Sequence, residues 1–393
     1  MTGQIRAPRI SGVGTDQLRR HNLSAILTLL HHHGSQPRSA LTAQTGLNRS
    51  TVAALVAELV DRGLAHESEP DPTNQVGRPS PTVNIDARNL VIAINPEVDA
   101  VTVGLVALGG KVVHRVRHDT DRPPTASEAV AIIAEIVEQL SGVQAADARI
   151  LGVGVAVPGL VRAADGLVRL APHLEWTDEP VGAMLADATG FDVAVGNDAR
   201  VGALVEHIFG VGRGLDDMVY LNGGPSGIGG GVIAAGALLG GASGYAGEFG
   251  HTRGGGGAGD VDLESLVRRS DLLAAVGRTA ASPDELDELV LHSDDPAVLE
   301  LVHAQLAALA PALGDAINIL NPSLIVLGGF LGAILQRDPG YLDGRVAAQA
   351  LTASYEDVRI ARAALGSDLL LIGAAELMFA KLLADPAGFG RGA

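Results

Sequence analysis

The strongest constraint on the fold is the alternation of apolar runs and helical patterns along residues 89–393. Three runs, LVIAIN, AVTVGLVAL and KVVHRV, follow one another with short turns, and a helical pattern over 126–140 precedes the run ILGVGVAVPGL. The same alternation of apolar runs and helical patterns occurs in FDVAVGNDARVGALVEHIFG and DMVYLNGGPSGIGGGVIAAG. Buried strands that alternate with helices are typical of α/β domains. A chain of 393 residues is long enough for two or three domains.

The composition narrows the chemistry and the compartment. Cysteine is absent, so disulfides, thiolate zinc sites and thiol nucleophiles are excluded. No run approaches the roughly 18 uncharged apolar residues that cross a bilayer, and the first residues lack the apolar core of a signal peptide. We therefore expect a folded, cytoplasmic protein that does not engage a membrane.

Charge is distributed unevenly along the chain. The net charge is −17, yet residues 1–60 hold six arginines against only Asp16 and Glu58. A basic end on an acidic protein indicates a nucleic-acid-binding domain at the N-terminus. The acidic remainder of the chain would repel the phosphates of nucleic acid. A solvated basic arm without a partner is the alternative, which charge alone does not exclude.

The first helical pattern runs from Leu18 to the stop signal Gly34, with apolar residues at spacings of three and four. It ends in three adjacent histidines, His31, His32 and His33. Because neighbouring helical residues point in different directions, these side chains cannot converge on one metal ion. We interpret them as a solvated helix end.

The stretch SALTAQTGLNRSTVAALVAELVDRGL predicts a helix-turn-helix. A short helix over Ser39–Thr45 and a second helix ending near Arg62 are joined by a glycine turn, the arrangement whose second helix enters the major groove of DNA. A plain helical hairpin is the alternative. The predicted DNA contacts are the residues around the start of the second helix, with Asn48 also able to cap it, and one further arginine of the basic end: Asn48, Arg49, Ser50, Thr51 and Arg38.

Two short extended runs around a polar, proline-rich tip follow Gly63 and predict a β-wing. Arg78, in the stiff segment VGRP, has the shape to enter a minor groove, although an interdomain linker explains this segment equally well. We predict a winged helix-turn-helix domain over residues 1–75 and a linker over 76–88.

Several ordered motifs resemble the ROK family of repressors and sugar kinases, in its regulator branch. They are LRRHNLSAIL, GRPSP, VAVPGLV, APHLEW, GNDARVGALVEH, GYAGEFGH and NILNPSLIVLGG. The resemblance implies an α/β, two-lobed, actin-like (ribonuclease-H-type) ATPase fold behind the winged helix. We predict a small lobe over 89–198, completed by a C-terminal helix at about 373–386, and a large lobe over 199–372.

The resemblance also implies a sugar site. The family's Asn-Asp pair matches Asn197 and Asp198, where Asp198 would be the vestigial general base. Its Glu-x-x-His element matches Glu248 and His251, and a further sugar-contacting glutamate matches Glu264. Asn197 and Asp198 could equally cap the helix that follows them, a role compatible with binding a sugar.

Three departures from the family limit what carries over. His173 stands in APHLEW where the family often has asparagine, so the ligand's identity does not transfer. The family's zinc loop has three cysteines that this chain lacks, so we expect the zinc to be lost; a hard cation on His251, Asp260, Asp262 and Glu264 is a minor alternative. Asn95-Pro96-Glu97-Val98-Asp99 replaces the kinases' first phosphate loop, and Pro96 removes an amide.

Taken together, these features predict a non-enzymatic, sugar-responsive repressor without cofactor or metal. We expect a homodimer or homotetramer on a palindromic operator in double-stranded DNA. Two alternatives stay open: a sugar kinase with a DNA-binding head, favoured by Asp198, and a DNA-binding protein whose body is only a dimerisation scaffold.

Overall fold

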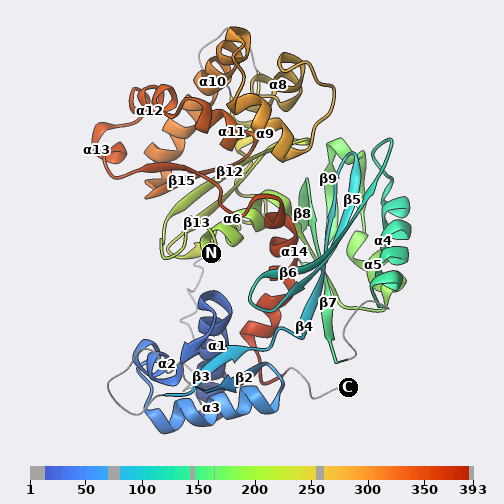
Figure 1. The fold of residues 1–393 in the computed structure, drawn as a ribbon, viewed down its shortest axis with the longest axis vertical. Coiled ribbons are helices and arrows are strands. Elements are labelled where there is room, and N and C mark those ends of the chain that lie inside the picture. The colour runs from blue at the N-terminus through green and yellow to red at the C-terminus, as the bar shows by residue number, and fades with distance from the viewer. Residues whose placement is uncertain (1–13, 70–79, 142–146, 163, 254–260, 389–393) are drawn as a thin grey trace, which may run out of the picture. The chain divides into compact units, whose positions relative to one another are not determined.

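The computed structural model describes residues 14–69, 80–141, 147–162, 164–253 and 261–388 (Figure 1). Arg78, Asp260 and the glycines 254–257 lie outside these ranges. The chain forms two compact units. We call Met1–Ala87 together with Phe379–Ala393 the head, and Arg88–Met378 the body.

Among its described residues, the head contains helices α1 to α3, the last turns of a C-terminal helix, and a small antiparallel sheet of strand order β1-β3-β2. Leu41, Val52, Val56 and Leu59 are fully buried, as expected for the inward faces of α2 and α3. Gly46, in the left-handed conformation, ends α2 and allows the tight turn into α3. The elements are α1 (Thr15–His33), β1 (Gln36–Pro37), α2 (Arg38–Thr45), α3 (Arg49–Asp61), β2 (Ala65–Ser68) and β3 (Thr82–Ile85).

The prediction of a solvated histidine end is wrong for His31. This side chain is buried, and its ring centroid lies 5.3 Å from that of Phe379 in helix α14 (Leu369–Ala384). From Phe379 onward α14 belongs to the head, where Ser24 Oγ donates to the Leu383 carbonyl and Arg20 pairs with Asp385 at 3.1 Å. The end of α1 is therefore covered by residues more than 340 positions away in the sequence.

The segment predicted as a linker, 76–88, contains part of the head's sheet. Strand β3 pairs with β2 from Ala65↔Ile85 to Ser68↔Thr82, and with β1 at Gln36↔Val83. Val83 and Asp86 are buried. Residues 86–88, after β3, connect it to the next strand, β4 (Asn89–Pro96).

The body contains two five-stranded sheets with the same topology. In each, three consecutive antiparallel strands are followed by two parallel strands added next to the first. The first sheet has the order β11-β7-β4-β5-β6 and the second the order β14-β13-β12-β15-β16. The first sheet is made of β4 (Asn89–Pro96), β5 (Ala100–Ala107), β6 (Lys111–Asp119), β7 (Arg149–Val157) and β11 (Val193–Asn197).

Helices cover both faces of the first sheet (Figure 1). Helices α4 (Ala126–Ser141) and α5 (Val181–Thr189) pack on the face that carries Val103 and Val155. The opposite face carries Gly104 and Gly154, where α14 packs closely: a Cβ at Gly154 would lie 1.8 Å from the Ala374 carbonyl oxygen. A small antiparallel sheet follows β7, with β8 (Leu160–Arg162), β9 (Leu167–Ala171) and β10 (Trp176–Glu179).

The second sheet begins after α6 (Asp198–Ile208). The glycine loop 223–231 is part of the β12–β13 hairpin, with Gly224 opposite Gly227. The sheet's strands are β12 (Met218–Gly224), β13 (Gly227–Ala234), β14 (Ala237–Leu238), β15 (Leu324–Gly329) and β16 (Arg359–Arg362). The helices of this half are α7 (Leu263–Leu266), α8 (Arg269–Ala275), α9 (Pro283–Leu291), α10 (Pro296–Leu320), α11 (Phe330–Arg337), α12 (Pro339–Ala347) and α13 (Thr352–Tyr355).

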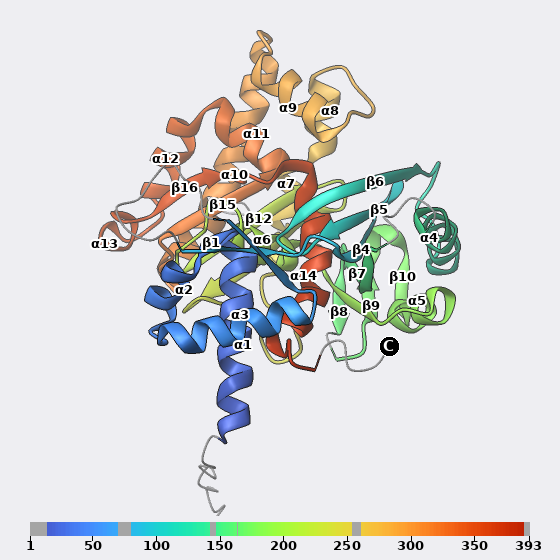
Figure 2. The ribbon, with the colours of Figure 1, turned by 60° about the horizontal axis from the view of Figure 1, so that its bottom comes forward.

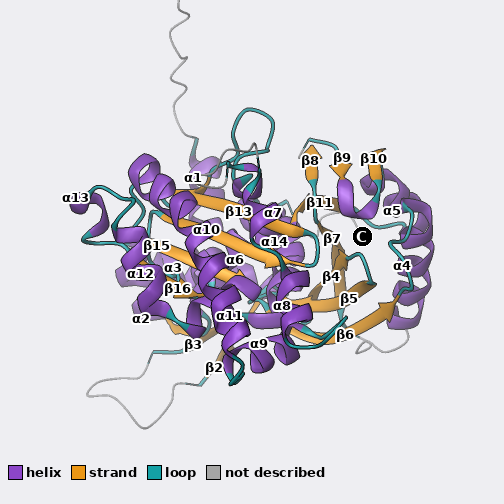
Figure 3. Cartoon of the chain, turned by 90° about the horizontal axis from the view of Figure 1, so that it is seen from above, coloured by secondary structure: helices purple, strands orange, loops and turns teal. Residues whose placement is uncertain are grey.

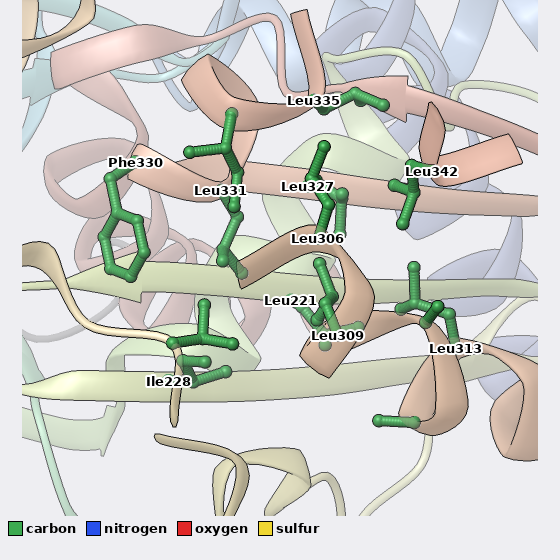
Figure 4. Close-up of a cluster of buried hydrophobic side chains, with 14 of the residues drawn as sticks. Leu221, Ile228, Leu306, Leu309, Leu313, Leu327, Phe330, Leu331, Leu335 and Leu342 are labelled. Carbon is green, nitrogen blue, oxygen red and sulfur yellow. The ribbon is translucent and has the colours of Figure 1, made fainter. Parts of the chain in front are cut away.

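Helices α10 and α11 lie over the second sheet and form the largest apolar cluster of the described residues (Figures 3 and 4). Leu306, Leu309 and Leu313 of α10 pack against Leu221 and Leu327 of the central strands. Within the described ranges, α10 alone is long and apolar enough to span a membrane, and half of its most apolar window is buried in the protein. A helix packed this way contributes to the core of a folded domain.

This core yields a matched pair of substitutions on one helix. Ile317 of α10 is fully buried, whereas Ile319 is 78% exposed. We expect Ile317→Ala to lower the free energy of unfolding by about 2–5 kcal/mol, because it removes buried methyl groups and leaves a cavity. Ile319→Ala should change it by less than about 0.5 kcal/mol. Urea denaturation measures both, and equal losses would contradict the packing described here.

Candidate functional site

The junction of β11 and α6 holds the predicted pair Asn197 and Asp198. Asn197 Oδ1 caps α6 by accepting from the Arg200 amide at 2.9 Å, and Asn197 Nδ2 donates to the Gly159 carbonyl at 3.0 Å. Asp198 Oδ1 accepts from the Ala199 amide at 2.7 Å. The capping alternative is therefore correct for Asn197, and it fixes the start of α6 without using every polar atom of the pair.

Close backbone contacts bring a second segment to β13. A Cβ at Gly247 would lie 2.6 Å from the Gly230 carbonyl oxygen, and a Cβ at Gly230 would lie 2.6 Å from the Gly247 oxygen. Only glycine tolerates such an approach, and Gly247 also has φ 104°. Glu248, which follows Gly247, and His251, in the 3-10 turn Phe249–His251, are thereby held beside β13.

Glu264 and His173 lie at the start of the same strand. A Cβ at Gly227 would lie 2.6 Å from Glu264 Oε2 and 3.8 Å from His173 Nε2. His251 Nδ1 is 3.8 Å from Glu264 Oε1 and 3.7 Å from Asp262 Oδ2. Two residues further along β13, a Cβ at Gly229 would lie 4.0 Å from Asp198 Oδ1. The glycines of β13 thus allow Asp198, Glu264 and His173 to lie close to this strand. Gly230 does the same for the segment that carries Glu248 and His251.

The carboxyl groups in this cluster influence one another. Burial raises the pKa of Asp198 to about 7; the hydrogen bond from Ala199 opposes the rise, and the charges of Glu97 and Glu248 add to it. Burial also raises the pKa of Glu248, with His251 and Arg200 opposing and Glu264 reinforcing. Carboxyl groups in such an environment can form hydrogen bonds with hydroxyl groups.

The sequence identified the Asn95–Asp99 segment but missed how its charges are compensated. The Glu97 amide donates to the Ala100 carbonyl at 2.7 Å, so the β4–β5 turn closes on itself. Arg117 of β6 lies 3.1 Å from the Glu97 carboxylate, 3.4 Å from Asp99 and 2.7 Å from Asp119. Burial raises the pKa of Glu97, and Arg117 opposes that rise. No short sequence motif predicts this pairing, because it depends on the register of β5 and β6.

Arg200 is a second residue that the sequence did not single out. It lies in the first turn of α6 and donates to the Gly244 carbonyl, in the loop that leads to Glu248. Its Nε is buried without a polar partner among the described residues. Arg200 therefore connects the Asn197–Asp198 junction with the Glu248 segment.

Neither a group of metal-binding side chains nor a surface hollow coincides with this cluster of polar residues in the described part of the chain. Within the described ranges, no three His, Asp or Glu side chains are grouped to hold a metal ion; Asp260 of the hard-cation alternative lies outside those ranges. Two open surface hollows, of about 340 and 400 Å³, lie at the ends of α8 and α9 and between α1 and α2, away from every predicted ligand residue. We therefore identify the candidate sugar site from the contacts and charges of its residues.

In the head, four of the predicted DNA contacts lie at the start of α3, namely Asn48, Arg49, Ser50 and Thr51. Asn48 Oδ1 accepts from the Thr51 amide at 2.9 Å and from Ser50 Oγ at 2.7 Å, so Asn48 is the N-cap. Arg49 and Ser50 are exposed. Arg38 differs from them, because its Nε and Nη2 both donate to the Glu67 carboxylate on β2.

The comparisons with known proteins identify the family. The model of the ROK family matches residues 91–381, so the chain belongs to the ROK family and has its mixed α/β, two-lobed, sugar-kinase-like fold. A protein assigned as a xylose repressor in Caldicellulosiruptor sp. (strain Rt8B.4) is 25% identical over 403 residues, covering 94% of this chain and 98% of the relative. A glucokinase of Thermotoga maritima is 31% identical over 258 residues, covering 58% of this chain and 78% of the enzyme.

A solved structure extends the similarity of fold to nearly the whole chain. A ROK family transcriptional regulator, a homologue of the E. coli MLC protein, has a TM-score of 0.74 at 22% identity. The similarity covers 93% of this chain and 97% of that one. The family thus includes both regulators and kinases, and the choice between them depends on the site.

The raised pKa of Asp198 predicts a pH-dependent cost of folding. The folded pKa of Asp198 is about 7, well above the 3.8 that is usual for aspartate, so its ionisation destabilises the protein as the pH rises from about 4 to 7. Asp198→Asn removes this ionisation, so we expect the variant to gain stability over the wild type across that range, by about 1–3 kcal/mol above pH 7.

Thermal unfolding at several pH values measures this difference. Asp315→Asn, on an exposed position of α10, gives a matched loss of one carboxylate. A difference between Asp198→Asn and the wild type that stays constant from pH 4 to pH 8 would contradict the buried environment of Asp198.

Proposed function

We propose that the protein is a sugar-responsive transcriptional repressor of the cytoplasm, active as a homo-oligomer on a palindromic operator. The head would be a winged helix-turn-helix domain that binds DNA, and the body would bind a sugar or sugar derivative. Sugar binding would favour an arrangement of subunits that no longer matches the operator's half-sites.

The observation that carries the proposal is the start of α3. Its first turn is fixed by the Asn48 cap while Arg49 and Ser50 remain exposed, which suits a recognition helix whose N-terminal residues contact base edges and phosphates. Thr51 would contribute through its hydroxyl. Strands β2 and β3 would form the wing, and Arg78 is proposed to assist in the minor groove. Arg38 is proposed in a supporting role, since Glu67 already holds it.

The proposed effector site comprises the residues gathered around β13. Carboxylates and amides discriminate among sugar hydroxyls because an unmatched buried group costs about 1–3 kcal/mol. The proposed ligand-binding residues are Asn197, Asp198, Glu248, His251, Glu264 and His173.

The β4–β5 turn supports a regulator over a kinase. Phosphoryl transfer needs backbone amides free to hold phosphates, usually with Mg²⁺ and cationic groups. Here Pro96 has no amide hydrogen, the Glu97 amide is bonded to Ala100, and Glu97 and Asp99 add negative charge. We propose that Asp198 binds ligand and has no catalytic role, and that no nucleotide cofactor is used.

A sugar kinase with a DNA-binding head is the second candidate. It is favoured by Asp198, whose pKa of about 7 suits a general base at neutral pH. Incubation with radiolabelled ATP and a panel of hexoses tests it. Turnover that Asp198→Asn abolishes would establish the kinase and overturn our assignment of the body.

The proposed function is tested by fluorescence anisotropy of the full chain on its own upstream DNA at fixed salt, with and without monosaccharides and sugar phosphates. Release by one sugar would support the repressor and name its effector. Tight binding that no sugar changes would favour the scaffold alternative, and absence of binding would contradict the helix-turn-helix.

Arg49 gives a direct prediction for the DNA contact. Arg49→Ala should weaken operator binding by about 1–3 kcal/mol and relax sequence preference, because a bidentate contact to guanine would be lost. Its affinity for sugar should not change. Arg345→Ala, which removes an exposed arginine of the body, is the control and should bind the operator like the wild type. Equal losses on operator and random DNA would show that Arg49 contacts only phosphate.

A further inference from the structure

Helix α14 packs against the Asn197–Asp198 junction on both sides of that pair. Before it, a Cβ at Gly196 would lie 3.1 Å from both methyl groups of Leu377. After it, a Cβ at Gly373 of α14 would lie 2.7 Å from Val201 Cγ2 and 3.2 Å from the Val201 carbonyl carbon. Figures 1 and 2 show α6 and α14 side by side. The residues proposed to hold the sugar are therefore bracketed by two contacts with a single helix.

The far end of α6 is fastened to the segment that leads into α14. Glu206 is fully buried, and its Oε1 accepts from the amides of Ala364 and Leu365 at 2.8 and 3.1 Å. Its Oε2 accepts from the Val211 amide at 3.0 Å. A carboxylate with three backbone donors holds this segment firmly, since removing it would leave buried amides unpaired.

The same helix ends inside the head. Residues of α14 up to Met378 belong to the body, and those from Phe379 belong to the head. There, Phe379 lies against His31 of α1, and the Leu383 carbonyl accepts from Ser24. Beyond the helix, the Ala387 carbonyl accepts from Arg62, directly after α3. The last turn of α14 is thus part of the unit that carries the predicted recognition helix.

We propose that α14 transmits the state of the sugar site to the head, with the Gly373–Val201 contact as the point of coupling. This inference rests on the proposed function and deepens it by naming the route of regulation. Because the contact leaves no space for even one methyl group, a shift of α6 at Asn197–Asp198 must move α14. Two packed elements with discrete arrangements are the physical requirement for such coupling.

The test uses Gly373→Ala in the full chain. The added methyl group forces α6 and α14 apart by a few tenths of an ångström without introducing a polar group. Gly344→Ala is the matched control, since Gly344 lies in α12 with nothing within 4 Å of its Cβ position. The double variant Gly373→Ala/Val201→Ala restores room at the contact and should reverse the effect.

Hydrogen exchange measured by mass spectrometry gives a result that requires no ligand. Gly373→Ala should accelerate exchange about threefold or more in both Arg200–Ala203 and Phe379–Leu383, while β12 stays protected. The control should match the wild type. Acceleration confined to residues 369–377, or equal in Gly344→Ala, would overturn the proposal.

Operator binding gives the second readout, with the sugar that releases the wild-type protein. Gly373→Ala should keep its affinity for that sugar and for the operator, but the change in operator affinity on adding sugar should fall to less than about twofold. Full release by the variant would overturn the proposal. Failure of every sugar to release the wild type would instead contradict the proposed function, and the exchange measurement would then decide the role of α14.

Discussion

Helix α6 occupies its place because small residues allow backbones to approach it from three directions. On β13, Gly229 and Gly231 would direct a Cβ to 2.5 Å from the methyl groups of Ala199 and Ala203. Gly202 of α6 faces the Tyr220 ring of β12, and Gly373 of α14 faces Val201. Since buried packing is dense, a larger residue at any of these points would displace the helix. The position of Asn197 and Asp198, and the site around them, depends on this packing.

The ROK family includes both kinases and regulators. Our proposal that this chain is a regulator depends on a few residues at the β4–β5 turn. There, Arg117 of β6 pairs with both Glu97 and Asp99. Burial raises the pKa of both Asp198 and Glu248, which lie in a low-dielectric environment.

Much of the fold was accessible from local patterns. The helix boundaries at Gly34 and Gly46, the Asn48 cap and the strand runs of the body are features of neighbouring residues, and the structure contains them. The residues around β13 that we propose to bind the sugar were predicted through a resemblance to a family, motif by motif. What failed was local inference about distant partners: the exposure of His31 and the extent of the linker at 76–88 were wrong because α14 and β2 cover those residues.

The sequence by itself determined which residue types are available and where they stand: the absence of thiols, the Asn95–Asp99 segment without glycine, the charged start of α3 and the polar motifs of the body. Which of these residues lie in contact with one another was decided only by the tertiary structure. Arg117 pairs with Glu97 through strand register, Glu206 binds the amides of Ala364 and Leu365, and the chain's last helix joins the head. These contacts join residues 20 to more than 340 positions apart, and their free energy comes from burial and charge pairing that no local pattern records.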